Sequence, residues 1–82
     1  MKEKSIRVKY FAKYRELLGI GEERLSTRCE TVGGLLEEIS KRHPELVSHK
    51  DFLISRNQNY ADPDSILADG DEIGILPPVS GG

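Results

Sequence analysis

The residues of this chain that could do chemistry stand at its end, in the run Pro77-Pro78-Val79-Ser80-Gly81-Gly82. Proline fixes φ near about −65° and donates no backbone N–H, so a preceding strand must stop pairing at Pro77. Two glycines without Cβ atoms then form a slender backbone that can enter a slot too narrow for side chains. The carboxylate of Gly82 would lie at the tip of this tail. The alternative interpretation is a frayed chain end without function.

The other reactive residue types form no recognisable site. Cys29 is the only cysteine, which argues against an intramolecular disulfide and a cysteine-based metal site. Cys29 is also the rival to Gly82 as the reactive residue of the chain, but we expect it on the inner face of a strand as a small core residue. His43 and His49 have no metal-like spacing, so we place them at a solvated helix end and in a loop and predict no metal site. The pair Gly33-Gly34 lacks the flanking residues of a phosphate-binding loop, and we expect it to pack closely on a sheet.

Length and charge narrow the classes of function. The chain has 82 residues, enough for one domain with one core. Charged residues make up 32% of the sequence with both signs interspersed, and the formal net charge is -2. This balance predicts neither a nucleic-acid partner nor an anionic membrane surface. No long apolar run follows Met1, so we expect no signal peptide and no membrane span, and the simplest location is the cytoplasm.

Hydrophobic periodicity predicts the elements that must position the tail. The main helix has the strongest pattern, because its apolar residues recur at the i, i+3, i+4 and i+7 positions behind Thr31, a good N-cap. These apolar residues are Val32, Leu35, Leu36 and Ile39. We expect helices at residues 12–18 and 32–43, and strands at residues 5–11, 22–29, 52–56, 60–61 and 71–76. The strand at 22–29 is weakly hydrophobic and therefore suits a sheet edge.

This order of elements predicts an α+β roll, a mixed sheet of four to five strands with one main helix packed on one face. Residues 1–76 would form the domain and residues 77–82 the extended tail. The expected core is Ile6, Val8, Tyr10, Leu17, Leu25, Val32, Leu35, Leu36, Ile39, Phe52, Ile54, Leu67, Ile73 and Ile75, with Ile66 beside Leu67 and Leu46 and Val47 below. The uncovered face would carry charges together with Phe11 and Leu76, and apolar residues rimmed by polar ones are typical of a partner surface.

Four segments carry a resemblance to a known family. They are Phe11-Ala12-Lys13-Tyr14-Arg15-Glu16-Leu17-Leu18-Gly19, Thr31-Val32, Arg56-Asn57-Gln58, and Asp69-Gly70-Asp71-Glu72 through Pro77-Pro78-Val79-Ser80-Gly81-Gly82. Together they resemble the small, sulfur-carrying subunits of molybdopterin synthase, which have the ubiquitin-like β-grasp fold. The resemblance spans nearly the whole chain, and the two ends of the chain are its most specific parts.

The resemblance implies a role for each part of the tail. Gly82 would be adenylated with ATP by a separate activating enzyme and converted to a thiocarboxylate with sulfur from a donor protein. The thiocarboxylate would donate sulfur to cyclic pyranopterin monophosphate on a large subunit, forming the dithiolene of molybdopterin in molybdenum cofactor biosynthesis. Gly81 would supply the slender approach, and Pro77, Pro78, Val79 and Ser80 would line the access channel. Leu76, Phe11 and Arg15 would belong to the partner-contacting surface.

The resemblance also implies the assembly and leaves other functions open. The small subunit would join the large one in a heterotetramer of two small and two large subunits, would bind no cofactor itself, and would not be catalytic alone. One alternative is a sulfur carrier for thiamine or for transfer RNA. Another is a ubiquitin-like protein modifier that is conjugated to lysines through Gly82. A third is a binding module whose tail is inert.

Overall fold

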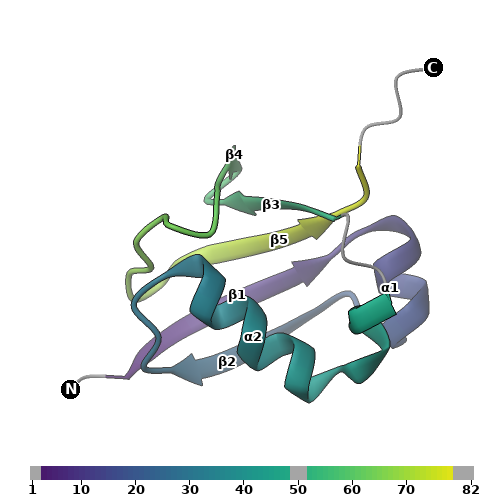
Figure 1. The fold of residues 1–82 in the computed structure, drawn as a ribbon, viewed down its shortest axis with the longest axis horizontal. Helices are drawn as coiled ribbons and strands as arrows, with labels where there is room; N and C mark the ends of the chain where they lie inside the picture. The colour runs from purple at the N-terminus through teal and green to yellow at the C-terminus, as the bar shows by residue number, and fades with distance from the viewer. Residues whose placement is uncertain (1–2, 49–51, 79–82) are drawn as a thin grey trace.

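The structure, a computed structural model, describes residues 3–48 and 52–78. Figure 1 shows the arrangement of the strands and helices. The elements are β1 (Lys4–Tyr10), α1 (Ala12–Leu18), β2 (Glu22–Thr27), α2 (Val32–Arg42), the 3-10 helix η1 (Pro44–Ser48), β3 (Leu53–Arg56), β4 (Asn59–Tyr60) and β5 (Glu72–Leu76). Each predicted helix and strand is present, with ends that differ from the prediction by one or two residues.

The strands form one mixed sheet in the order β2-β1-β5-β3-β4. The first and last strands of the chain, β1 and β5, pair in parallel at its centre, with Val8 opposite Ile73. The remaining neighbours are antiparallel. Helix α2 crosses one face of this sheet, and β2 lies at an edge (Figure 1). The predicted α+β roll and the edge position of the second strand are therefore confirmed. We call the face that α2 does not cover the open face.

Helix α2 begins and ends where its sequence predicts. The Thr31 side chain accepts a hydrogen bond of 3.2 Å from the Gly34 backbone N–H, which satisfies one of the free donors of the first turn. The face of α2 that carries Val32, Leu35 and Ile39 is buried. The helix ends at Arg42 because Pro44 lacks the N–H that another turn would need, and η1 begins at that proline.

The core lies between α2 and the inner face of the sheet. Its buried apolar residues are Ile6, Val8, Tyr10, Tyr14, Leu25, Val32, Leu35, Ile39, Leu46, Ile54, Leu67, Ile73 and Ile75. Leu36 and Phe52 pack against this cluster and are partly buried. The structure describes the backbone of Val47 in η1 but not its side chain, so its place in the core stays a prediction.

Two core predictions were wrong. Leu17 is 37% exposed, and the buried residue of α1 is Tyr14. A helix has 3.6 residues per turn, so Leu17 and Leu18 lie on opposite sides of Tyr14, and only Leu18 packs against the core. Ile66 is 67% exposed while Leu67 is buried, because consecutive residues of an extended segment point to opposite sides.

The glycine pair of α2 was expected to pack closely on the sheet. In the structure it packs against two loops instead. A Cβ atom on Gly33 would lie 3.1 Å from the carbonyl oxygen of Pro63. A Cβ atom on Gly34 would lie 3.3 Å from the Cβ of Cys29. The two glycines therefore allow the loops before α2 and before β5 to approach its first turn closely.

Two further observations hold for the described ranges. No helix there is long and apolar enough to cross a membrane. Within the same ranges, no three His, Cys, Asp or Glu side chains are grouped as metal ligands would be.

Candidate functional site

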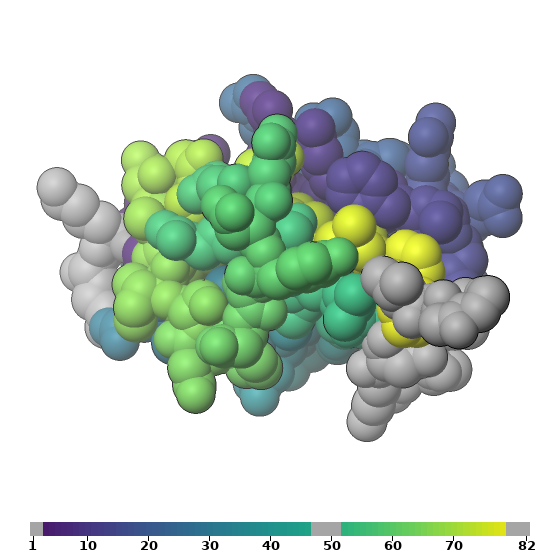
Figure 2. Space-filling view, turned by 90° about the horizontal axis from the view of Figure 1, so that it is seen from above, coloured from purple at the N-terminus to yellow at the C-terminus, as the bar shows by residue number. Residues whose placement is uncertain are grey.

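Strand β5 delivers the chain to the surface beside the end of β1. It is held on both sides, by β1 and by β3, and the Phe11 backbone N–H adds a hydrogen bond of 3.1 Å to the carbonyl of Ile75. The strand ends at Leu76, followed by the half-buried Pro77 and the exposed Pro78. Figure 2 shows the end of β5 (yellow) at the surface, between the β3–β4 hairpin (green) and the start of α1 (purple). The predicted site residues Val79, Ser80, Gly81 and Gly82 lie outside the described residues.

An apolar patch lies next to this exit. It consists of Phe11, Tyr60 and Leu76, and we call it the exit patch. Phe11 is 41% exposed and Tyr60 is 74% exposed, whereas Leu76 is half-buried. The patch lines a hollow of about 460 Å³ on the open face together with Lys9, Ser55, Gln58 and Glu72. The prediction that Phe11 and Leu76 share the outer face is confirmed, although Leu76 is more buried than expected.

Tyr60 was not predicted from the sequence as a surface residue of this site. This residue pairs with Ser55 in the β3–β4 hairpin, so both side chains point to the same face. Its register becomes visible only in the structure, where Asn57 and Gln58 in the turn before it both have positive φ and fix the position of the returning arm. An aromatic side chain that is exposed beside two other apolar residues is typical of a docking surface.

Gly74 in the middle of β5 lets Ser55 and Phe11 lie close to the backbone of this strand. A Cβ atom there would clash with the Ser55 hydroxyl oxygen and would lie 3.2 Å from the Cε2 atom of Phe11. The Phe11 ring therefore extends across the backbone of β5 towards Leu76. A glycine inside a strand often marks such a close approach.

Arg15 lies on the other side of Phe11. A second hollow, of about 550 Å³, is lined by Lys9, Tyr10, Phe11, Ala12, Arg15, Ile20, Gly21 and Glu22. Ala12 begins α1 with φ of 51°, an uncommon value for a residue with a Cβ atom, and the chain turns there from β1 into the helix. Phe11 lines both hollows, so the structure brings the predicted partner residues Phe11, Arg15 and Leu76 onto one continuous surface.

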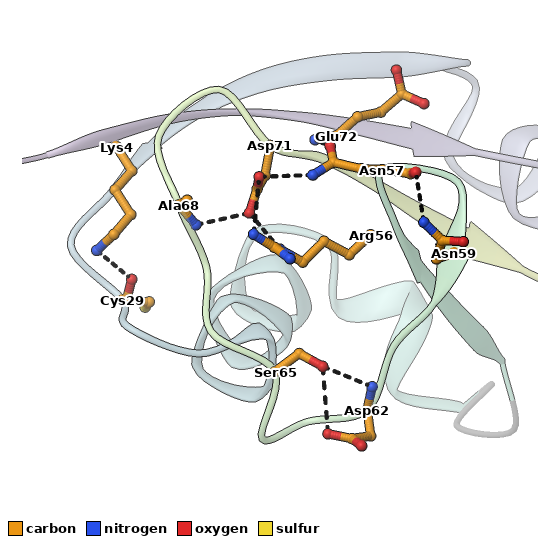
Figure 3. Close-up of polar contacts among 10 residues, drawn as sticks. All are labelled: Lys4, Cys29, Arg56, Asn57, Asn59, Asp62, Ser65, Ala68, Asp71 and Glu72. Carbon is orange, nitrogen blue, oxygen red and sulfur yellow. Dashed lines mark hydrogen bonds and ion pairs between the residues drawn. The ribbon is translucent and has the colours of Figure 1, made fainter.

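A buried carboxylate holds the β3–β4 hairpin against the start of β5. Asp71 is 5% exposed and accepts hydrogen bonds of 2.7 Å from Arg56 Nε, 3.0 Å from Asn57 Nδ2 and 2.7 Å from the Ala68 backbone N–H. The Asn57 side-chain oxygen in turn accepts from the backbone N–H of Glu72, as Figure 3 shows. The segments Arg56-Asn57-Gln58 and Asp69-Gly70-Asp71-Glu72, far apart in the sequence, are thus joined.

This network shifts the ionisation of Asp71. Burial alone would raise the pKa of the carboxyl group, but the hydrogen bonds from Ala68, Asn57 and Arg56 and the charge of Arg56 outweigh burial and lower the pKa. Asp71 is therefore ionised at neutral pH. It fixes the hairpin that carries Gln58 and Tyr60 relative to the exit strand.

His43 lies at the end of α2, as predicted, but it is half-buried and not solvated as expected. Its Nε2 atom lies 2.6 Å from Glu23 Oε2, and its ring packs edge-on against Tyr10 with the ring centroids 5.8 Å apart. Glu23 also accepts hydrogen bonds of 2.5 Å from the Tyr10 hydroxyl and 3.2 Å from Arg42 Nε. Burial raises the pKa of Glu23, but the hydrogen bonds from Tyr10 and His43 outweigh it and lower the pKa. This cluster connects β1, β2 and the end of α2, away from the exit patch. His49 lies outside the described residues.

Cys29 lies beyond the end of β2, and not on the inner face of a strand. Its half-exposed thiol donates a 2.7 Å hydrogen bond to Glu38, and its carbonyl oxygen accepts from Lys4 Nζ at 2.9 Å (Figure 3). Burial and the neighbouring Glu38 carboxylate raise the pKa of the thiol. A thiol that ionises so reluctantly is a poor nucleophile, which disfavours Cys29 as a sulfur carrier.

Known proteins are similar to this chain in sequence and in fold. Residues 8–82 match the ThiS family. The molybdopterin synthase sulfur carrier subunit of Chlamydomonas reinhardtii is 43% identical over 82 residues, which cover 94% of this chain and 98% of that protein.

Two solved structures share the fold. The solution structure of small archaeal modifier protein 1 from Methanosarcina acetivorans has a TM-score of 0.84 and 32% identity, with all of both chains covered. Subunits 1 and 2 of the molybdopterin-converting factor from Helicobacter pylori were solved as a complex, and the matching chain has a TM-score of 0.66 and 26% identity, with 95% of this chain and 99% of that one covered.

Proposed function

This chain belongs to the ThiS family and is a sulfur carrier of the molybdopterin synthase type, and we propose that it holds the sulfur as a thiocarboxylate on Gly82. The observation that carries the proposal is the family match, which runs through the tail to Gly82 itself. The geometry supports it, because β5 is anchored on both sides and directs the chain outwards beside an apolar patch. No side chain of this protein has to act as nucleophile or base, since the reacting group is the backbone carboxylate.

The proposed sulfur transfer proceeds in three steps. A carboxylate oxygen of Gly82 attacks the α-phosphate of ATP on an activating enzyme, and pyrophosphate leaves. A sulfur atom at the sulfide level, supplied by a donor protein, then replaces AMP at the acyl carbon. The thiocarboxylate sulfur finally attacks a carbon of cyclic pyranopterin monophosphate and displaces the oxygen substituent bound to that carbon, which forms a thioester. Hydrolysis of this thioester by water leaves the sulfur on the product and restores the carboxylate. Two such cycles build the dithiolene. Because the activation step would use ATP, we infer the cytoplasm as the location of the protein.

The exit patch is the surface that serves the partners. A large subunit of molybdopterin synthase would cover Phe11, Tyr60 and Leu76 while its channel receives residues 77–82. The Helicobacter pylori complex of subunits 1 and 2 supports a partner of this kind. The activating enzyme needs the same tail, so it would bind in turn and not at the same time. The complete synthase would contain two small and two large subunits.

Intact-mass spectrometry tests the proposal. The purified chain is incubated with its activating enzyme, ATP and a sulfur donor. We expect its mass to rise by the difference between one sulfur and one oxygen atom, and to return to the starting value after addition of the large subunit and cyclic pyranopterin monophosphate. A return that depends on a thiamine precursor or on transfer RNA instead would assign the carrier to one of those pathways.

Deleting Gly82 provides the first variant. We expect the mass change and the sulfur transfer to disappear while the melting temperature is unchanged, because the core that the structure describes is built from residues between Ile6 and Ile75. An alanine substitution of Lys41, which is exposed on α2, is the matched control and should leave transfer unchanged. Normal transfer by the chain without Gly82 would overturn the proposal.

A second function is favoured by one observation. The small archaeal modifier protein 1 shares the fold and 32% of the sequence, which supports conjugation of Gly82 to lysine side chains of other proteins. The two functions share the adenylate and diverge after it. Covalent adducts of higher mass, resistant to thiols and absent from the chain without Gly82, would demonstrate the modifier function in cells.

A further inference from the structure

Two arginines of the open face lie directly opposite each other. Arg7 on β1 pairs with Arg24 on β2 in the antiparallel register. Like charges at directly opposed positions destabilise a sheet. The hollow between these strands and the neighbouring turns has a volume of about 330 Å³ and is lined by Ser5, Arg7, Arg24, Asn57, Gly70 and Glu72. An arrangement that costs stability within the chain is typical of a functional surface.

The guanidinium groups of this pair are only loosely held. Arg7 Nε lies 3.7 Å from a Glu22 oxygen, and Arg7 Nη1 lies 3.7 Å from a Glu72 oxygen. Both distances exceed the range of a hydrogen bond. Within residues 3–48 and 52–78, Arg24 forms neither a hydrogen bond nor an ion pair. Because each guanidinium carries five N–H donors, the hollow presents many donors without short acceptors.

The other groups around the hollow are already occupied. The Asn57 side chain bonds to Asp71 and to the Glu72 backbone, and the Gly70 N–H donates to the Ser5 carbonyl at 2.8 Å. Glu72 is the one acidic residue of the lining, and Arg7 is ion-paired with it and with Glu22, so the unbalanced positive charge of the hollow is that of Arg24. A ligand that fits must bring acceptor oxygens and negative charge, and a carboxylate can bond two guanidinium N–H groups at once.

The hollow is continuous with the exit patch. Glu72 lines this hollow and also the hollow of the exit patch. Arg7 and Phe11 are four residues apart in extended chain, a span of about 13 Å. A protein interface of ordinary size buries about 800 Å² on each side, roughly 30 Å across. A partner centred on the exit patch would therefore also cover Arg7 and Arg24.

We propose that the hollow between Arg7 and Arg24 receives an aspartate or glutamate side chain of the large subunit. This proposal rests on the proposed function, because it assumes that the large subunit covers the exit patch. The carboxylate lies between the two guanidinium groups, relieves their repulsion, and fixes the orientation of the carrier so that its tail is directed into the channel. The apolar contacts supply most of the affinity, and the charge pair supplies orientation and association rate.

Substitution of Arg24 by glutamine separates this role from a structural one. We expect Arg24→Gln to keep or raise the melting temperature, because it removes a like-charge pair. We expect it to weaken binding to the large subunit about fivefold at low salt, about 0.05 M, and the difference from the unsubstituted chain to shrink towards about 0.5 M salt, where charges are screened. Lys41→Gln, which removes the same charge from the exposed side of α2, should leave the affinity unchanged.

Titration calorimetry on the full chain and its large subunit gives the readout. Restoration of tight binding to an Arg24→Glu chain, by exchanging one acidic residue of the large subunit for lysine, would identify the occupant and confirm the proposal. If Arg24→Gln leaves the affinity for the large subunit unchanged, or if Lys41→Gln lowers this affinity equally, the proposed carboxylate site is overturned. This holds even if Arg24→Gln weakens binding to the activating enzyme. If the unsubstituted chain forms its thiocarboxylate normally, such a result leaves the proposed function intact. A chain that neither forms a thiocarboxylate nor binds the large subunit would overturn both.

Discussion

The two faces of the sheet follow opposite principles, although the same strands build both. On the inner face, Ile6, Val8, Ile73 and Ile75 are completely buried. In alternation with these residues, the open face carries the charged side chains of Arg7, Lys9 and Glu72, and beside the exit of the tail it carries the apolar side chains of the exit patch. Stability is therefore concentrated on one face, and the groups that can meet a partner are concentrated on the other.

This division teaches how a chain of 82 residues can carry an interface. A domain of this size buries a small core and has little stability to spare. If inner residues also had to reach a partner, each change in recognition would cost stability. With recognition on the open face, the partner surface can change while the core remains as it is.

The largest effect on stability is expected at the inner face. Leu35 of α2 is completely buried, so Leu35→Ala should lower the free energy of unfolding by about 2 to 5 kcal/mol through lost contacts and a residual cavity. Urea denaturation measures the shift in midpoint. Glu37→Ala, at an exposed position of the same helix, is the control and should change stability by less than about 0.5 kcal/mol. A small loss for Leu35→Ala would show that the inner face does not carry the stability.

The converse effect is expected at Leu76. A charge there lies in the exit patch, so Leu76→Asp should weaken association with the large subunit by about 2 kcal/mol or more, roughly 30-fold. Because Leu76 is half-buried, we also expect a loss of unfolding free energy, of about 1 kcal/mol. Ile66→Asp places the same charge on an exposed apolar residue outside the patch and should bind normally. A fall in stability as large as that of Leu35→Ala would assign Leu76 to the core.

The same division explains what the sequence could predict. The strands, α2 and its Thr31 cap follow from periodicity and local chemistry, and each was found at its predicted place. Phe11 and Leu76 were also assigned correctly, because alternation along a strand decides which face a side chain occupies.

The missed features depend on pairing between distant segments. Tyr60 reaches the exit patch only through its register with Ser55, and His43 is half-buried because Glu23 of β2 lies beside the end of α2. Asp71 meets Arg56 across 15 positions of the sequence. No local pattern contains such register, so these contacts could be read only from the folded chain.

A smaller effect on stability, dependent on pH, is expected at Asp71, which holds the β3–β4 hairpin against the start of β5. Asp71→Asn removes the charge from a network of hydrogen bonds and should cost about 1 to 2 kcal/mol at neutral pH. The pKa of Asp71 is lower in the folded than in the unfolded chain, so its contribution is present above the unfolded value of about 3.9 and is lost as the pH falls through the folded value.

Unfolding midpoints measured from pH 7 down to pH 2 test this prediction. The unsubstituted chain should lose stability below about pH 4, and the asparagine variant should lose less over the same range. Some pH dependence should persist in the variant, because the pKa of Glu23 and that of Glu38 are also lowered in the folded chain. Parallel curves for the two proteins would contradict an ionised, hydrogen-bonded Asp71.

The smallest effect is expected at Ala12, where the chain passes from the end of β1 into α1. Its φ of 51° is unfavourable for a residue with a Cβ atom, whereas Gly19 at the other end of α1 has φ of 74° without that penalty. Ala12→Gly should therefore stabilise the fold by about 0.5 kcal/mol, the relief of strain being partly offset by the more flexible unfolded chain. Gly19→Ala, the reverse exchange, should destabilise it by about 1 kcal/mol.

If Ala12→Gly also weakens binding to the large subunit, this strained residue contributes to holding Phe11 in the exit patch. A loss of stability in Ala12→Gly would show that Ala12 is not strained and that the separation of the two faces does not depend on this turn.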